Sequence, residues 1–213
     1  MDAITASDLI LLFGAWKQLF AEQREFLIAL DGKVGDSDLG ITMSKSFAAA
    51  AEAVEAEGEA AGIAKLLRTA GATMARTAPS TMGTLTATGF LRASKAVETA
   101  ASLGTPEMAA FWAAYRDGIA ERGKAKVGDK TIVDVLDPVA RTLEEQAAAG
   151  VSLAPALAAA AAAAEDALEQ TKTLVAQHGK AAAFQEKTVG LQDAGATVGA
   201  LILRELSKFA SAQ

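Results

Sequence analysis

Residues 7–20 read Ser-Asp-Leu-Ile-Leu-Leu-Phe-Gly-Ala-Trp-Lys-Gln-Leu-Phe, and this stretch decides the fold class. Its apolar side chains recur every three or four residues, at Leu9, Leu12, Phe13, Trp16, Leu19 and Phe20. That spacing places them on one face of an α-helix, because a helix turns once every ~3.6 residues. Ser7 stands where a capping residue is expected. The stretch therefore predicts an amphipathic helix that begins at its cap and ends near Leu30.

The same spacing continues along most of the chain. Further helices are expected over residues 40–57, 61–76, 82–100, 106–122, 131–148, 154–177 and 194–210. The alternating pattern of a β-strand is not found, and short connections between successive helices favour antiparallel neighbours. The sequence therefore predicts an all-α protein, a single-domain barrel or bundle of about eight antiparallel helices over residues 1–213.

Composition excludes several classes of function. The chain has 213 residues, a net charge of −6 and no cysteine, which argues against a nucleic-acid surface, disulfides and zinc–thiolate sites. A serine hydrolase would have to use the single histidine, His178, and no Gly-x-Ser-x-Gly turn accompanies it. The N-terminus shows no signal peptide, and no apolar run suggests a membrane span. We expect a cytoplasmic protein without nucleic-acid or membrane partners.

An acidic stretch follows the first expected helix. Residues 30–40 read Leu-Asp-Gly-Lys-Val-Gly-Asp-Ser-Asp-Leu-Gly and contain Asp31, Asp36 and Asp38. Carboxylates so close together repel one another unless a cation lies between them, and glycines let the backbone bend to bring them together. A small set of oxygen ligands suits Mg²⁺, which often takes further ligands from nucleotide phosphates. The stretch predicts a magnesium–phosphate site.

Two alternatives compete with this interpretation. Segments rich in aspartate and glycine also form ordinary solvated turns and helix caps, and the stretch alone leaves that reading open. A calcium-binding EF-hand loop that started at Asp36 would need glycine at Ile41 and glutamate at Phe47, so this rival fails. The metal site therefore depends on finding phosphate-binding elements elsewhere in the chain.

In an all-helical chain, phosphates would be bound at helix N-termini, where backbone N–H groups are free. Residues 38–42, 78–84 and 190–197 each lead into an expected helix, and each could equally be an ordinary cap. Residues 118–124 imitate the spacing of a Walker A loop. The final serine or threonine is missing, because Ala125 stands in its place, and the stretch ends a helix, so we reject a P-loop.

Four blocks stand out when they are taken in order. They are residues 30–40, residues 122–135 with Gly-Asp-Lys-Thr at 128–131, residues 178–181 (His-Gly-Lys-Ala), and residues 192–197 (Gln-Asp-Ala-Gly-Ala-Thr). Together they resemble the nucleotide-binding L subunit of dihydroxyacetone kinases, and the resemblance covers essentially the whole chain. The fold known for that family is a barrel of eight antiparallel helices with an adenine nucleotide at one end, which agrees with the expected helix count.

The resemblance implies roles for the matching positions. Asp31, Asp36 and Asp38 match three aspartates that hold two Mg²⁺ ions against the phosphates of ADP or ATP. The phosphate contacts are implied for Leu39, Gly40, Ile41, Thr42, Ser80, Thr81 and Met82. The remaining nucleotide contacts are implied for Gly123 and Ile132 at the adenine, for Lys180 at a commonly basic position, and for Asp193, Ala194 and Gly195.

The chain also departs from the family pattern in two places. Leu39 stands where the family commonly has a histidine, and residues 79–85, Pro-Ser-Thr-Met-Gly-Thr-Leu, replace a glycine-rich block. These departures imply a divergent branch, whose sugar is dihydroxyacetone or another short ketose such as erythrulose.

The family resemblance further implies how the protein works. The ketose would be bound covalently by a histidine of a separate K-type subunit, and this chain would supply the nucleotide. Metal-assisted transfer needs no protein nucleophile, so no catalytic residue is expected here, and we interpret His178 as a cap. The phosphoryl donor is either ATP or a phosphohistidine protein of the phosphotransferase system. Two further hypotheses remain: a non-catalytic nucleotide sensor that binds a transcriptional regulator, and a structural protein with an empty acidic loop.

Overall fold

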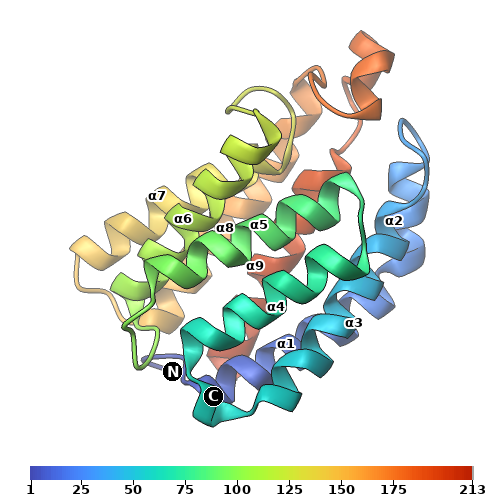
Figure 1. Ribbon diagram of the computed structural model, residues 1–213. Coiled ribbons are helices and arrows are strands. Elements are labelled where there is room, and N and C mark those ends of the chain that lie inside the picture. The colour runs from blue at the N-terminus through green and yellow to red at the C-terminus, as the bar shows by residue number, and fades with distance from the viewer. Residues whose placement is uncertain (213) are drawn as a thin grey trace.

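The computed structural model describes residues 1–212, and it confirms the all-α prediction (Figure 1). Within that range the α-helices are α1 (Ala6–Glu22), α2 (Arg24–Asp31), α3 (Leu39–Glu57), α4 (Ile63–Thr77), α5 (Thr81–Ala96), α6 (Thr105–Gly123), α7 (Ile132–Ala148), α8 (Leu153–Gln170) and α9 (Ala194–Ala212). Three 3₁₀ segments are η1 (Glu59–Ala61), η2 (Thr171–Thr173) and η3 (Lys180–Thr188). Among these residues β pairing is limited to one bridge, between Ile4 and Leu103.

The long helices form a closed ring. α1 packs on α3, each helix from α3 to α9 packs on the next, and α9 packs on α1. Most successive helices are joined by short connections and run antiparallel, so alternate connections lie at the same end of the barrel (Figure 1). Among the described helices, none combines the length and apolar character that a membrane span requires.

Aromatic side chains fill the inside of the ring. Phe20 and Phe47 stack with ring centroids 4.4 Å apart, and Phe90 meets Tyr115 edge-on at 5.2 Å. These four rings are fully buried, and they belong to one continuous apolar core that includes residues of every α-helix from α1 to α9. Burial of each large side chain contributes about 2 kcal/mol, so the core, more than helix propensity, holds the barrel together.

The first helix differs from its predicted boundaries at both ends. Its cap is Thr5, whose Oγ1 accepts from the N–H of Asp8 at 3.3 Å while Asp8 Oδ2 accepts from the N–H of Thr5 at 2.9 Å. The predicted cap, Ser7, lies in the first turn, so that prediction was wrong. The helix also ends at Glu22, because Gln23 leaves the helical conformation, and α2 begins at Arg24.

The helix predicted over residues 154–177 also ends earlier than expected, because α8 stops at Gln170. The hydroxyl of Thr171 donates to the carbonyl of Leu168 at 2.6 Å, and that of Thr173 donates to Gln170 at 2.8 Å. Such side-chain bonds compete with the backbone pattern of a helix. The chain between α8 and α9 therefore becomes a long connection at one end of the barrel (Figure 1), and His178 and Lys180 belong to it.

α2 crosses the start of α3 at very close range. A Cβ atom on Gly40 would lie 2.1 Å from the carbonyl oxygen of Arg24 and 2.9 Å from Cγ1 of Ile28. Only glycine allows this approach. The crossing fixes the end of α2, which carries Asp31, beside the start of α3, where Asp38 precedes the first turn.

Candidate functional site

The three aspartates singled out in the sequence meet at the turn between α2 and α3. Each of Asp31, Asp36 and Asp38 offers a carboxylate oxygen, and these oxygens lie within 4.8 Å of one another. The N–H of Asp38 donates to Asp31 Oδ2 at 3.1 Å. A Cβ atom on Gly35 would lie 2.2 Å from Asp31 Oδ1, so the turn folds tightly around that carboxylate. Close approach of the backbone therefore brings the carboxylates together.

The charges of this cluster are only partly compensated. Burial raises the pKa of Asp38 above its ordinary value, and the negative charges of Asp36 and Asp31 raise it further. Lys180 donates to Asp36 Oδ2 and thereby lowers the pKa of Asp36. One lysine thus faces three carboxylates. Asp38 is at the N-cap position of α3 but its side chain makes no capping bond, so this residue does not behave as an ordinary cap.

This donor set fits Mg²⁺. The side-chain ligands are hard carboxylate oxygens, they are too few to fill a calcium shell, and the cluster opens into a pocket where phosphate oxygens could complete the coordination. The pocket measures about 820 Å³ and lies at the end of the barrel that carries the α8–α9 connection. An adenine nucleotide falls within the size range of ligands that such pockets enclose.

Most of the predicted site residues line this pocket. They are Asp31, Asp36, Asp38, Leu39, Ser80, Thr81, Met82, Gly123, Ile132, Lys180, Asp193, Ala194 and Gly195. Gly40, Ile41 and Thr42 do not line it: they continue the first turn of α3 behind Leu39, where Gly40 packs on α2 and Thr42 is buried. The pocket thus unites the four blocks of sequence that carry the family resemblance.

Four helices begin at this pocket. Leu39, Thr81, Ile132 and Ala194 are the first residues of α3, α5, α7 and α9, and all four line it. This follows from the antiparallel ring, in which every second helix starts at the same end. The first N–H groups of a helix lack partners within the helix and form its positive end, so several such ends around one pocket favour an anion such as a phosphate chain.

Residues 79–85, which replace the family's glycine-rich block, form the turn that leads into α5. Ser80 Oγ accepts from the N–H of Gly83 at 3.1 Å, so this hydroxyl is an N-cap and is already engaged. A Cβ atom on Gly83 would lie 2.2 Å from the carbonyl oxygen of Ala78, which keeps the turn tight. Thr81 is exposed at the pocket beside Met82. The side chain of Thr81 and the N–H groups of Thr81 and Met82 remain available to a ligand, whereas the N–H of Gly83 is engaged by Ser80.

The wall away from the carboxylates is apolar and closely packed. A Cβ atom on Gly195 would meet Met82 Sδ at 3.5 Å and the backbone nitrogen of Ile132 at 3.7 Å. A Cβ atom on Gly123 would meet Leu85 Cδ2 at 3.4 Å. Gly123 and Gly195 thus leave room beside the apolar side chains of Met82 and Leu85 on α5, a surface suited to a flat aromatic ring.

Asp193 caps α9 and is the most perturbed acid of the pocket. Its Oδ2 accepts from the N–H of Ala196 at 2.7 Å, which confirms the predicted cap. Burial raises the pKa of Asp193 from 3.8 to about 6, against the opposing effects of that hydrogen bond and of Lys130. The ionised form is therefore penalised in the folded protein.

Because of this raised pKa, ionised Asp193 should lower the free energy of unfolding as the pH rises. Asp193→Asn removes the ionisable group, while the amide oxygen can still accept the hydrogen bond from Ala196. The folded state binds the proton of Asp193 more tightly than the unfolded chain does. The stabilisation that this proton provides is therefore complete below pH ~4 and is lost as the pH rises through about 6. The unfolding free energy of wild type minus that of Asp193→Asn should fall by roughly 3 kcal/mol over this range. Urea unfolding of both proteins measures it, and a difference that does not change with pH would contradict the assignment.

Several pocket residues received no site role from the sequence. Arg122, Lys130, Thr131 and His178 all line the pocket. The cap interpretation of His178 was wrong, because its Nε2–H donates to Asp129 Oδ2 at 2.9 Å, across 49 positions of sequence. The Gly-Asp-Lys-Thr block at 128–131 was the one available signal for Lys130 and Thr131, but it does not show where their side chains lie.

Comparison with known proteins identifies the family of this chain. Residues 33–208 match the model of the DAK2 domain. The chain is 35% identical to the "PEP-dependent dihydroxyacetone kinase, ADP-binding subunit DhaL" of Escherichia coli, over 84% of this chain and 85% of that protein. It is also 35% identical to a D-erythrulose kinase of Mycolicibacterium smegmatis, over 92% of this chain and 34% of that protein.

A solved structure shows the same fold. The crystal structure of the dihydroxyacetone kinase from C. freundii in complex with AMP-PNP and Mg²⁺ superposes with a TM-score of 0.71 at 23% identity, over 93% of this chain. The present chain spans 33% of that kinase. From the domain match and the identity over most of the E. coli protein, the chain belongs to the DAK2 domain family, with the ADP-binding L subunits of dihydroxyacetone kinases.

Proposed function

We propose that this chain is the magnesium–nucleotide-binding subunit of a kinase for dihydroxyacetone or a related short ketose. The observation that carries the proposal is one pocket in which three carboxylates, four helix N-termini and an apolar wall come together. The carboxylates suit the metal, the helix ends suit the phosphates and the apolar wall suits the adenine. The names of the relatives, ADP-binding subunits and erythrulose kinases, support the same assignment.

Each part of the pocket then has a defined role. Asp31, Asp36 and Asp38 would hold two Mg²⁺ ions, which neutralise charge on the phosphates when bound. The starts of α3 and α5, through Leu39, Thr81 and Met82, would bind the phosphates, whereas Gly40, Ile41 and Thr42 would support the first turn of α3 and Ser80 would cap α5. Gly123 and Ile132 would contact the adenine, and Asp193, Ala194 and Gly195 would contact the nucleotide at the start of α9. Lys180 would add a positive charge beside the metal ligands.

The residues of this chain act by binding and orientation, and none acts as nucleophile. The ketose is held by a separate K-type subunit, which reaches the phosphate at the open end of the barrel. The relatives that match over most of their own length are PEP- or PTS-dependent. This favours a donor cycle in which ADP stays bound and is rephosphorylated by a phosphohistidine protein, in the cytoplasm. Residues 1–213 would form one nucleotide-binding domain.

Reconstitution tests this function. The purified chain alone should not phosphorylate dihydroxyacetone or erythrulose, and addition of a cognate K-type subunit with a phosphoryl donor should start the reaction. Two donor mixtures separate the mechanisms: ATP alone, and phosphoenolpyruvate with the proteins of the phosphotransferase system. We expect turnover with the second mixture and little with the first. Turnover by the chain alone would show that the ketose site is not on the K-type subunit. Turnover with ATP alone would show that ATP is the phosphoryl donor.

A further inference from the structure

The connection between α8 and α9 forms a closed loop whose two ends meet. The N–H of Gly190 donates to the carbonyl of Lys172 at 2.7 Å, so residues 171–172 and 190–191 form a neck that closes the loop of residues 173–189. Inside the loop, the N–H of Ala176 donates to Thr188 Oγ1 at 3.0 Å. Figure 1 shows this segment projecting beyond the end of the barrel. His178 and Lys180 lie on it and line the nucleotide pocket.

Lys130 fixes the neck from inside the protein. Its Nζ donates to the carbonyl of Thr171 at 2.6 Å and to that of Leu191 at 2.7 Å, one on each side of the neck. The side chain starts from a backbone in the left-handed conformation, with φ of 59°, and the residue is only 4% exposed. A buried ammonium group is costly unless it is hydrogen-bonded, so both carbonyls are strongly held in place.

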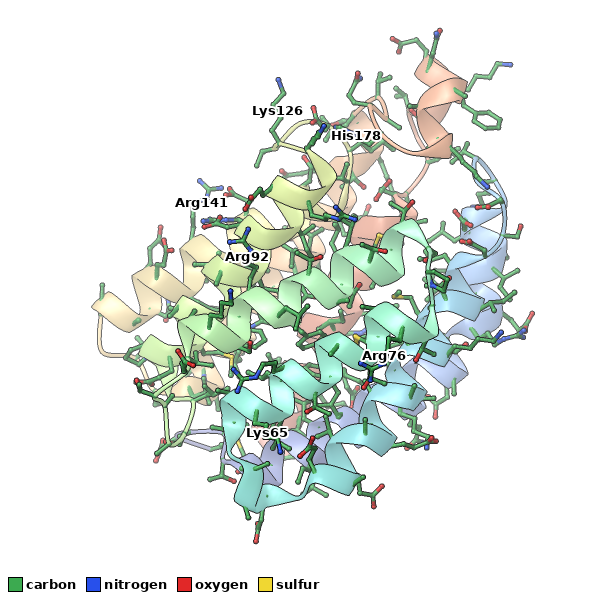
Figure 2. All side chains as sticks on the ribbon, viewed as in Figure 1. Lys65, Arg76, Arg92, Lys126, Arg141 and His178 are labelled. Carbon is green, nitrogen blue, oxygen red and sulfur yellow. The ribbon has the colours of Figure 1, made fainter. Side chains whose placement is uncertain are left out.

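Asp129 holds the body of the loop. Its carbonyl accepts from the N–H of Gln177 at 3.1 Å, and its Oδ2 accepts from Nε2–H of His178 at 2.9 Å. The same Oδ2 accepts from the N–H of Lys126 at 2.9 Å, which fixes the carboxylate itself. In Figure 2 His178 points toward the α6–α7 connection, which carries Lys126. Asp129 is 8% exposed and therefore shielded from competing water.

Apart from the bonds at its neck, where the hydroxyl of Thr173 also donates to the carbonyl of Gln170 at 2.8 Å, one further polar contact joins the loop to the barrel among the described residues, that of Lys180 with Asp36. This pair is exposed, and such pairs contribute little. Asp36 is also a proposed metal ligand, so its pairing with Lys180 must change when Mg²⁺ binds. In the metal-bound protein, the position of the loop then depends on Asp129.

We propose that Asp129 and Lys130 are positioning residues of the nucleotide site: Lys130 fixes the neck, and Asp129 holds loop 173–189 against the pocket and thereby sets how long a nucleotide stays bound. This inference rests on the proposed function and adds a determinant of nucleotide retention. Neither residue has to touch the nucleotide. The loop forms one wall of the pocket, so a loop that is held in place more firmly should release bound ADP more slowly.

Dissociation kinetics test the proposal. A fluorescent ADP analogue with Mg²⁺ should dissociate about 10-fold faster from Asp129→Ala than from wild type, with little change in the association rate. His178→Ala should show part of this effect, and the double variant should be no faster than Asp129→Ala, because both side chains belong to one contact. Asp129→Asn keeps an acceptor for Lys126 and should recover part of the retention. Arg92→Gln removes an exposed ion pair with Glu121 and should match wild type.

Hydrogen exchange of the nucleotide-free protein gives a second readout. In Asp129→Ala, amides of residues 174–187 should exchange faster while Gly190 stays protected; in Lys130→Met, Gly190 should lose protection as well. Unchanged dissociation and unchanged exchange in folded Asp129→Ala would overturn the inference, as would additive effects in the double variant. If wild type binds no nucleotide, the proposed function fails, and exchange alone decides whether Asp129 holds the loop.

Discussion

Replacing Asp36 with alanine should weaken binding of Mg-ADP by about 100-fold, or about 3 kcal/mol. The variant removes one of the three carboxylates of the proposed metal site, and a bound metal ion is often the largest local charge in such a site. The side chain of Asp36 is 42% exposed, so its loss should change the unfolding free energy by no more than about 0.5 kcal/mol. Titration calorimetry measures the affinity, and circular dichroism measures the helical fold.

Asp2→Ala is the matched control for charge. It removes the same negative charge from an exposed aspartate near the N-terminus, at the other end of the barrel (Figure 1). Its affinity for Mg-ADP should equal that of wild type. If Asp36→Ala bound as tightly as wild type, the metal site would lie elsewhere. If both variants weakened binding equally, net charge would explain the effect.

Gly40→Ala should lower the unfolding free energy by about 3 kcal/mol. The added Cβ would lie 2.1 Å from the carbonyl oxygen of Arg24, which is backbone and cannot rotate away. α2 would have to move off α3, and the carboxylate of Asp31 at its end would move with it. We therefore expect a loss of Mg-ADP affinity together with the loss of stability. Urea unfolding and calorimetry on the same preparation measure both.

Gly14→Ala gives the contrasting result. A Cβ atom at Gly14, inside α1, would have nothing within 4 Å, so alanine should stabilise the helix by up to ~1 kcal/mol and leave nucleotide binding unchanged. Equal destabilisation by both substitutions would show that the α2–α3 crossing is not the cause of the effect at Gly40.

The helices were predictable because their apolar spacing is a local property. Leu9, Leu12 and Phe13 lie on one face whatever the rest of the chain does, and they are buried as expected. The ends of the helices depend on which side chains form hydrogen bonds with the backbone there. The sequence does not reveal that Thr5, and not Ser7, would form the capping box, or that the hydroxyl of Thr171 would bond to Leu168 and end α8.

The acidic cluster was predictable for the same reason, since its members are close in sequence. Contacts across the barrel were not. Lys180 reaches Asp36 across 144 positions, and Lys130 spans 41 and 61 positions to its two carbonyl partners. The family resemblance placed Lys180 near the nucleotide, but the role of Asp129 and Lys130 in holding loop 173–189 depends on three-dimensional packing that residue spacing does not encode.

Calorimetric titration of the nucleotide-free protein with ADP, in the presence and absence of Mg²⁺, tests the central claim most directly. The three carboxylates and the helix N-termini share one pocket, so metal and phosphates should depend on each other for binding. We predict saturable binding of a single ADP per chain with Mg²⁺, and its loss when the metal is chelated. Absence of ADP binding in the presence of Mg²⁺, or binding that chelation leaves unchanged, would contradict the account.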